Sequence, residues 1–143
     1  MRGAFSAWQF WALLSATFAA LTALFAKVGV ENVGADFATF ARTVVVVLAL
    51  GALLTATGQW QAPSSVSGKS WLFLILSGLA TGASWLCYFR ALKLGDAARV
   101  APVDKLSVVM VAIFGALLLG EELSLVAWLG VALIAVGAAL VAL

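Results

Sequence analysis

Long apolar stretches alternate with short polar ones along almost the whole chain. Five of them, residues 8–26, 37–56, 71–92, 100–119 and 123–143, are mainly apolar. Each has about the 20 residues that a helix needs to cross about 30 Å of hydrocarbon. None keeps up an alternation with a period of two, and all are about twice as long as a barrel strand. The pattern predicts an all-α membrane protein with five transmembrane helices.

The connections between these stretches are short. Residues 27–36, 57–70, 93–99 and 120–122 carry glycine, proline, serine and charged residues, which are typical of helix ends and turns. They leave no room for a soluble domain, so one membrane domain over residues 1–143 is expected. The first apolar stretch exceeds the roughly 7 to 15 residues of a signal peptide and is expected to stay as the first span.

Composition agrees with a lipid environment and narrows the class of function. Of the 143 residues, 65% are hydrophobic and 10% are charged, whereas soluble domains average about half and about a quarter. The net charge of +2 gives no basic surface for nucleic acid. With no histidine and one cysteine, Cys87, the chain lacks the ligands of a zinc, copper or haem site. No catalytic residue set or phosphate loop is present, so we expect no enzyme, no metal and no cofactor.

An odd number of spans places the two ends of the chain on opposite sides of the membrane. Two basic residues near the ends of the spans fall on the N-terminal side and four on the C-terminal side. They are Arg2 and Lys69 on the first side and Lys27, Arg90, Lys93 and Arg99 on the second. Basic loops favour the cytoplasm, so the C-terminal side is predicted to be cytoplasmic, and the small margin leaves insertion in both orientations open.

Three ionisable residues lie inside the predicted spans, where a charge costs about 2.5 to 3.5 kcal/mol at a helix centre and tends to face a cavity. Arg42 lies about 8 Å from one end of its span, and Asp104 and Lys105 lie about 6 to 8 Å from the end of theirs. We predict that all three contact a substrate. Arg42 or Lys105 would meet an anionic group, and Asp104 would balance the charge or take a proton. The alternative is a structural ion pair of Arg42 with Asp104, while Lys105 extends to the interface.

Two features of the third and fourth spans have both a packing and a functional interpretation. Pro102 fits either the first turn of a helix, where its missing N–H is not needed, or a hinge beside the charged pair. Gly78 and Gly82 have the GxxxG spacing of closely packed membrane helices. They could instead leave room for a substrate that rests on the rings of Trp85 and Tyr88.

The last span has two features of its own. Glu121 and Glu122 stand just before it, where the helix dipole stabilises carboxylates, so a capping role is favoured. Gly130 and Gly137 lie seven residues apart on one face, which indicates a close helix contact, such as one across a dimer.

Two motifs resemble the EamA family of the drug/metabolite transporter superfamily. The first is WLCYFRALKLGDAARVAP at residues 85–102, and the second begins with LGE at residues 119–121. Further matching positions extend the resemblance over nearly the whole chain. They are Trp11, Ala12 and Lys27 near the beginning and Leu123, Trp128, Leu129, Gly130 and Gly137 near the end.

The resemblance implies a function. Members of this family usually have ten spans, made of two inverted five-span repeats, and move small metabolites or drugs across the inner membrane. This chain is similar to one repeat, which implies that two copies assemble antiparallel into a transporter with alternating access. Asp104 and Lys105 stand where the family commonly has small or hydroxyl residues, and Val108 stands where it commonly has proline.

The prediction is therefore a secondary transporter subunit in the lipid bilayer. The residues expected to bind its small-molecule substrate are Arg42, Trp85, Tyr88, Asp104 and Lys105. Two alternatives stay open: one half of an obligate heterodimer with a similar chain, and a non-transporting accessory or scaffold protein that docks its glycine faces onto a larger partner.

Overall fold

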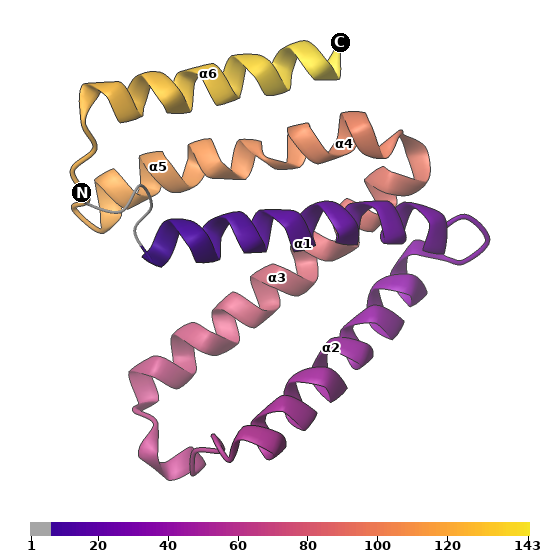
Figure 1. Cartoon of the computed structure of the whole chain (residues 1–143), viewed down its shortest axis with the longest axis vertical. Helices are drawn as coiled ribbons and strands as arrows, with labels where there is room; N and C mark the ends of the chain where they lie inside the picture. Colours follow the sequence, from indigo (N-terminus) through magenta and orange to yellow (C-terminus); the bar gives the residue numbers. More distant parts are fainter. Residues whose placement is uncertain (1–6) are drawn as a thin grey trace. The chain divides into compact units, whose positions relative to one another are not determined.

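The computed structural model describes residues 7–143, and within that range every regular element is helical (Figure 1). Arg2, counted above, lies outside the described residues. The elements are α1 (Ala7–Gly29), α2 (Ala35–Thr57), the 3-10 turn η1 (Pro63–Ser65), α3 (Gly68–Leu94), α4 (Ala97–Asp104), α5 (Leu106–Leu118) and α6 (Leu125–Ala142). Because α4 and α5 form one span, the described chain has five helices long and apolar enough to cross a membrane. The predicted all-α membrane fold is confirmed.

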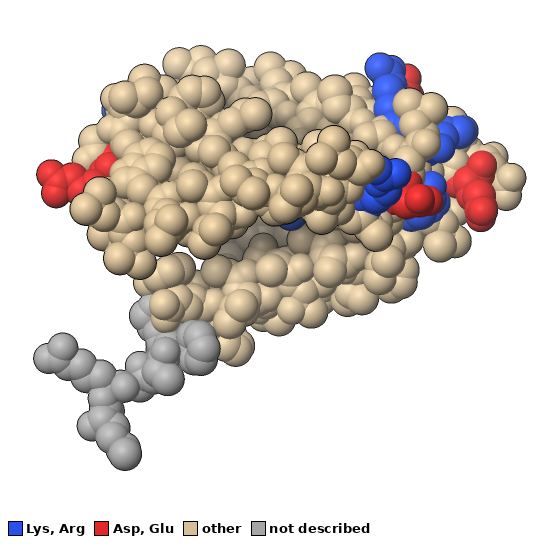
Figure 2. All heavy atoms as spheres, turned by 90° about the horizontal axis from the view of Figure 1, so that it is seen from above, with Lys and Arg blue, Asp and Glu red and all other residues tan. Residues whose placement is uncertain are grey.

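Most large apolar side chains of the described helices are exposed, as expected where lipid is the solvent. Phe37, Leu79 and Leu133, for example, are each about two-thirds exposed. The face seen in Figure 2 has almost no charged side chains between the helix ends, where Lys, Arg, Asp and Glu gather. So much exposed apolar surface is unfavourable in water, whereas it is favourable in the hydrocarbon of a bilayer.

The chain forms two compact units. Of the described residues, the first consists of 7–27 together with Leu94–Leu143, and the second is Val28–Lys93. In the first unit α6 runs beside α4 and α5. In the second unit α2 and α3 form a hairpin.

Hydrogen bonds to main-chain carbonyls fix the helix ends of the first unit. The Nζ of Lys27, in the last turn of α1, donates to the carbonyl of Gly95 at 2.8 Å. The guanidinium of Arg99 donates to the carbonyls of Val141 and Ala142, at 3.5 and 3.1 Å. Because these carbonyls end α6 and have no partner within it, they and the helix dipole favour a cation there.

The fourth span breaks at Lys105, between α4 and α5. The N–H of Lys105 is shared by the carbonyls of Ala101 and Pro102, at 3.2 and 3.1 Å, and the N–H of Val108 donates to the carbonyl of Lys105. Such bonds over three residues tighten the helix locally. α4 begins at Ala97, three residues before the predicted start, so Pro102 lies inside it. The first-turn interpretation of Pro102 is therefore wrong, and a proline inside a helix favours a kink.

A serine caps α6. The Oγ of Ser124 accepts a hydrogen bond from the N–H of Ala127 at 3.2 Å, which satisfies one of the free N–H groups of the first turn. Glu121 and Glu122 lie in the preceding connection, and the first turn holds no acidic residue. The capping role predicted for them is therefore wrong, because the side chain next to the helix already serves it. The N–H of Glu121 instead donates to the carbonyl of Gly115 in α5.

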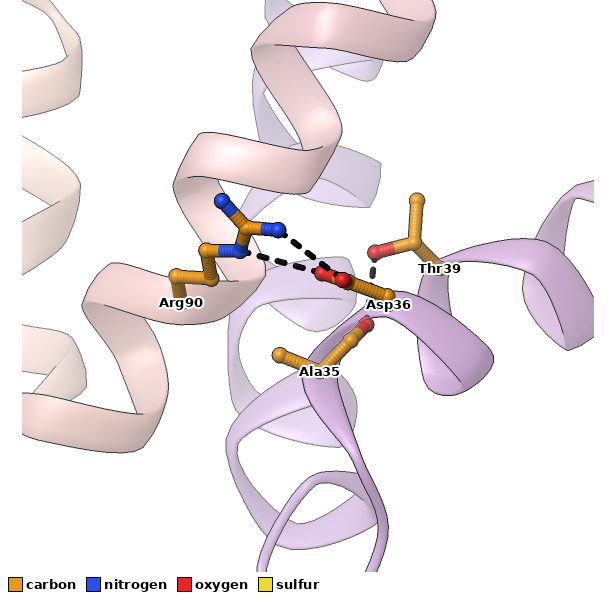
Figure 3. Close-up of polar contacts among 4 residues, drawn as sticks. All are labelled: Ala35, Asp36, Thr39 and Arg90. Atoms are coloured by element: carbon orange, nitrogen blue, oxygen red, sulfur yellow. Dashed lines mark hydrogen bonds and ion pairs between the residues drawn. The ribbon is translucent and has the colours of Figure 1, made fainter.

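The hairpin of the second unit is held at both ends. At one end α2 stops at Gly58, whose positive φ of 66° lets the chain turn toward η1. At the other end Arg90 of α3 donates from Nε and Nη2 to both carboxylate oxygens of Asp36 in α2, at 3.0 and 2.9 Å (Figure 3). The Nζ of Lys93 donates to the carbonyl of Val33 at 2.7 Å. These contacts join the start of α2 to the end of α3.

Candidate functional site

An open groove of about 440 Å³ lies between α2 and α3 within the second unit. α3 supplies a face of small residues to it: Ser77, Gly78, Thr81 and Gly82. A methyl group built onto Gly78 or Gly82 would meet no described atom within 4 Å. The close packing predicted from their GxxxG spacing is therefore absent within the described chain, and both glycines border open space.

Arg42 is the only charged residue among those lining the groove. Its Cζ lies 3.2 Å from the centroid of a Trp85 ring, so the flat guanidinium rests on the face of the indole in a cation–π contact. The two residues come from α2 and α3, on opposite walls. Asp36, which is also in the second unit, is bound to Arg90. The structure thus brings together two of the predicted site residues.

Tyr88 supports Trp85 and is not among the residues that line the groove. The Trp85 ring meets the Tyr88 ring nearly edge-on, with centroids 5.7 Å apart, and the Phe89 ring at 5.8 Å. These residues are three and four positions apart on α3, where helix side chains meet. Phe89 is 3% exposed, so one neighbour of Trp85 is anchored in the small core. This arrangement fixes the ring on which Arg42 stacks.

Hydroxyl groups from both helices border the same groove. The Oγ1 of Thr43 donates to the carbonyl of Thr39, and the Oγ1 of Thr81 donates to the carbonyl of Ser77, each at 2.8 Å. Because these bonds use the hydroxyl protons, both threonines present acceptor oxygens to the groove. Sequence reasoning missed Thr43, which is visible only as the neighbour of Arg42.

Asp104 and Lys105 lie in the other unit, at the break of the fourth span. The Nζ of Lys105 lies 3.3 Å from Oδ2 of Asp104, and both side chains are partly exposed. Neighbouring residues of a continuous helix point about 100° apart. Asp104 and Lys105 nevertheless pair, at the position where the helix is interrupted. A pairing of Asp104 with Arg42, which belongs to a different unit, stays a prediction.

Sequence reasoning also missed the Asp36–Arg90 ion pair, since it used Arg90 to orient the chain and as part of the family motif but gave it no partner. Both side chains are about 60% exposed. In the view of Figure 3 the Thr39 hydroxyl, which donates to the carbonyl of Ala35 at 2.9 Å, lies beside the pair. The pair could have been found from the antiparallel hairpin of two consecutive spans, because such a hairpin places the first turn of one helix beside the last turns of the next.

Together these features define a helical, multi-pass membrane protein with a cationic groove between two spans. The model of the EamA-like transporter family matches residues 6–143, and the chain belongs to this family. It is 72% identical over 135 residues to a Sinorhizobium sp protein named "Uncharacterized transporter in cobO 3'region". The matched region covers 94% of this chain and 96% of that protein. No solved structure matches. The resemblance found in the sequence motifs is confirmed.

Proposed function

We propose that the protein is a subunit of a secondary transporter for small metabolites or drugs in the inner membrane. The observation that carries the proposal is the groove between α2 and α3, with Arg42 stacked on Trp85. A charge inside a span is costly and marks a substrate or ion pathway by default. Membership of a transporter family supports the same conclusion.

The working unit in this proposal is an antiparallel dimer. One chain supplies five spans, whereas transporters with inverted repeats place the substrate between two such halves. The open faces at Gly78 and Gly82 on α3, and at Gly130 and Gly137 on α6, have no described atom near them. They offer surfaces for a second copy or a solute. Rocking of two copies around the shared site would give alternating access, driven by a proton or solute gradient.

We propose two sets of substrate contacts, one within each unit. Arg42 and Trp85 meet the substrate in the groove, with Tyr88 at the edge of the Trp85 ring. Asp104 and Lys105 contribute from the break in the fourth span, where discontinuous helices of transporters bind ions and substrates. An Asp104→Asn variant should then transport with an altered pH dependence. Unchanged dependence would remove Asp104 as the coupling group.

The orientation of the chain tests the dimer. Single cysteines at Ser65 in η1 and Asp96 before α4, in a Cys87→Ala background, report opposite ends of α3. Partial labelling of both sites from outside intact cells supports two orientations and the homodimer. Labelling of Ser65 alone would contradict the homodimer and point to a partner inserted the other way. The Cys87→Ala chain without added cysteines is the control.

Uptake into proteoliposomes tests transport itself. A panel of amino acids, sugars, organic acids and amines should include at least one solute with saturable uptake that empty liposomes lack. If none is taken up, and the chain purifies as a monomer or always with an unrelated large subunit, the accessory or scaffold alternative replaces the proposal.

A further inference from the structure

We infer that the groove between α2 and α3 takes an amphiphilic organic acid, whose carboxylate binds Arg42 and whose apolar body lies against α3. The inference rests on the proposed transport function and names the chemical class of its substrate. It follows from the charge, the geometry and the depth of the groove.

Charge balance calls for an anion. Arg42 carries the only charge among the lining residues, and its contact within the second unit is the ring of Trp85. An aromatic face attracts a cation but does not neutralise it. Because a buried or lipid-facing charge is stabilised chiefly by an opposite charge, the groove favours a ligand with a net negative charge. A cationic ligand would meet the repulsion of Arg42.

The geometry favours a carboxylate in particular. Stacking on Trp85 occupies one face of the guanidinium and leaves its edge, where the N–H groups lie in a plane, for another ligand. This edge matches the two oxygens of a carboxylate, which it binds through two parallel hydrogen bonds. Trp85 in turn is held by its contacts with Tyr88 and Phe89. The arginine is thus oriented before the ligand arrives.

The remainder of the groove suits an apolar body with few polar groups. Val46 and Leu74 supply apolar walls, and Gly78 leaves open space beside them. Thr43 and Thr81 present acceptor oxygens, because their protons are already donated to main-chain carbonyls. A hydroxyl or amide N–H on the ligand would find a partner there.

The depth of Arg42 favours a solute over a lipid headgroup. Arg42 is the seventh residue after Ala35, the first residue of α2, which places it about 10 Å along the helix. A lipid phosphate has the same oxyanion chemistry but lies at the level of the helix end. An aromatic or aliphatic acid of small size can reach the deeper position.

Calorimetric binding to the chain in phosphatidylcholine nanodiscs tests this inference with three matched probes. They are 3-phenylpropionate, its neutral amide and the cationic 3-phenylpropylamine. We expect the carboxylate to bind about tenfold or more tightly than the other two, because a charge-assisted bidentate pair contributes that much. Equal affinity for the three probes would overturn the inference.

Variants of Arg42 assign the binding to the groove. Arg42→Gln should weaken 3-phenylpropionate about tenfold or more, and Arg42→Lys should fall between, since lysine keeps the charge but not the planar fork. Arg99→Gln, which removes a guanidinium bound to carbonyls in the other unit, is the matched control and should keep the affinity. Unchanged binding by Arg42→Gln, with helicity preserved, would overturn the inference.

Three further outcomes separate the alternatives. If phosphatidylglycerol nanodiscs abolish probe binding, and mass spectrometry shows bound phosphatidylglycerol that Arg42→Gln loses, the ligand of Arg42 is a lipid and the inference is overturned. Saturable uptake of amines that is insensitive to Arg42→Gln would overturn the inference but uphold transport. Binding of the carboxylate through Arg42 without uptake of any solute would uphold the groove and overturn transport.

Discussion

A single arginine defines the chemistry of the second unit at the residue scale. Arg42 lies within a membrane span, and the indole face of Trp85 compensates part of its cost. The ring faces Arg42 because α3 places Tyr88 and Phe89 on the same side. Trp85 is therefore a positioning residue for the guanidinium as well as a wall of the groove.

Replacing Trp85 with leucine should weaken carboxylate binding without abolishing it. The cation–π contact contributes about 0.5 to 2 kcal/mol, so the Kd of 3-phenylpropionate should rise about 2- to 30-fold. In the Trp85→Leu background, the further change Arg42→Lys should weaken binding less than it does in the original chain. Trp71→Leu, which removes an indole at the opposite end of α3, is the control. Equal losses in both tryptophan variants would contradict a specific role for Trp85.

The cap of α6 makes a second prediction at this scale. Ser124→Ala removes the side-chain acceptor of the Ala127 N–H and should lower the free energy of unfolding by about 1 kcal/mol. Glu122→Gln should leave it nearly unchanged, because no acidic residue stands in the first turn. Denaturation in mixed micelles measures both. A larger loss for Glu122→Gln than for Ser124→Ala would restore the carboxylate cap expected from the sequence.

The α2–α3 hairpin shows at the element scale how a groove stays open between adjacent spans. The contacts that hold it are at its ends: the turn through η1, the Asp36–Arg90 pair and the Lys93–Val33 bond. Small residues on α3 keep the middle hollow, and open space lies beside Gly78. Because the ends are fixed, the width of the groove depends on few polar contacts.

Breaking the Asp36–Arg90 pair should therefore increase the motion between the start of α2 and the end of α3. Spin labels on the first turn of α2 and the last turn of α3 should show a broader distance distribution in Arg90→Asp than in the original chain. The exchanged pair, Asp36→Arg with Arg90→Asp, should restore the narrow distribution because it rebuilds the attraction. If the exchanged pair stays as broad as the single variant, the ion pair does not hold this end.

The break in the fourth span is the second feature at this scale. Pro102 supplies no N–H to the turn before it and crowds that turn. Pro102→Ala should add a bond to the carbonyl of Ala98 and slow amide hydrogen exchange across the break between α4 and α5. The free energy of unfolding should rise by up to about 3 kcal/mol. Faster or unchanged exchange at residues 105–108 would show that the break does not depend on the proline.

The glycines of α6 permit a test of assembly at the scale of the whole molecule. Gly130 lies five residues after Leu125, the first residue of α6, and Gly137 lies five before Ala142, the last. The two are thus symmetric about the middle of the helix, and open space lies beside both. In an antiparallel pair of α6 helices, Gly130 of one copy lies at the depth of Gly137 of the other. In a parallel pair, these two residues are about 10 Å apart in depth.

Cysteine crosslinking distinguishes these arrangements. In a Cys87→Ala background, chains with Gly130→Cys and chains with Gly137→Cys, expressed together, should form mixed disulfide dimers more readily than either forms alone. The antiparallel match of depth is the reason. Cysteine at Val136, which is exposed and lies about 100° around α6 from Gly137, controls for random collision. Self-crosslinking at Gly137 without mixed dimers would contradict the antiparallel dimer.

The sequence alone determined the environment, the class of fold and the family. Length and polarity suffice for these, because a helix must be about 20 residues long and apolar to satisfy its backbone in lipid. The same reasoning selected Arg42 as a candidate site residue, because a charge within such a span is costly and usually marks a functional site. The family motifs at residues 85–102 and 119–121 then indicated a transporter, which the match over residues 6–143 supports.

Only the tertiary structure decided which side chains meet. It stacked Arg42 on Trp85, paired Asp36 with Arg90 and moved the cap of α6 from the glutamates to Ser124. It also left Gly78 and Gly82 facing open space and put Pro102 inside α4. In lipid nearly every face of such a helix is apolar, so periodicity does not reveal which face meets a neighbour. Which face meets a neighbour depends on the polar contacts and on the ends of the helices, because these hold the spans in place.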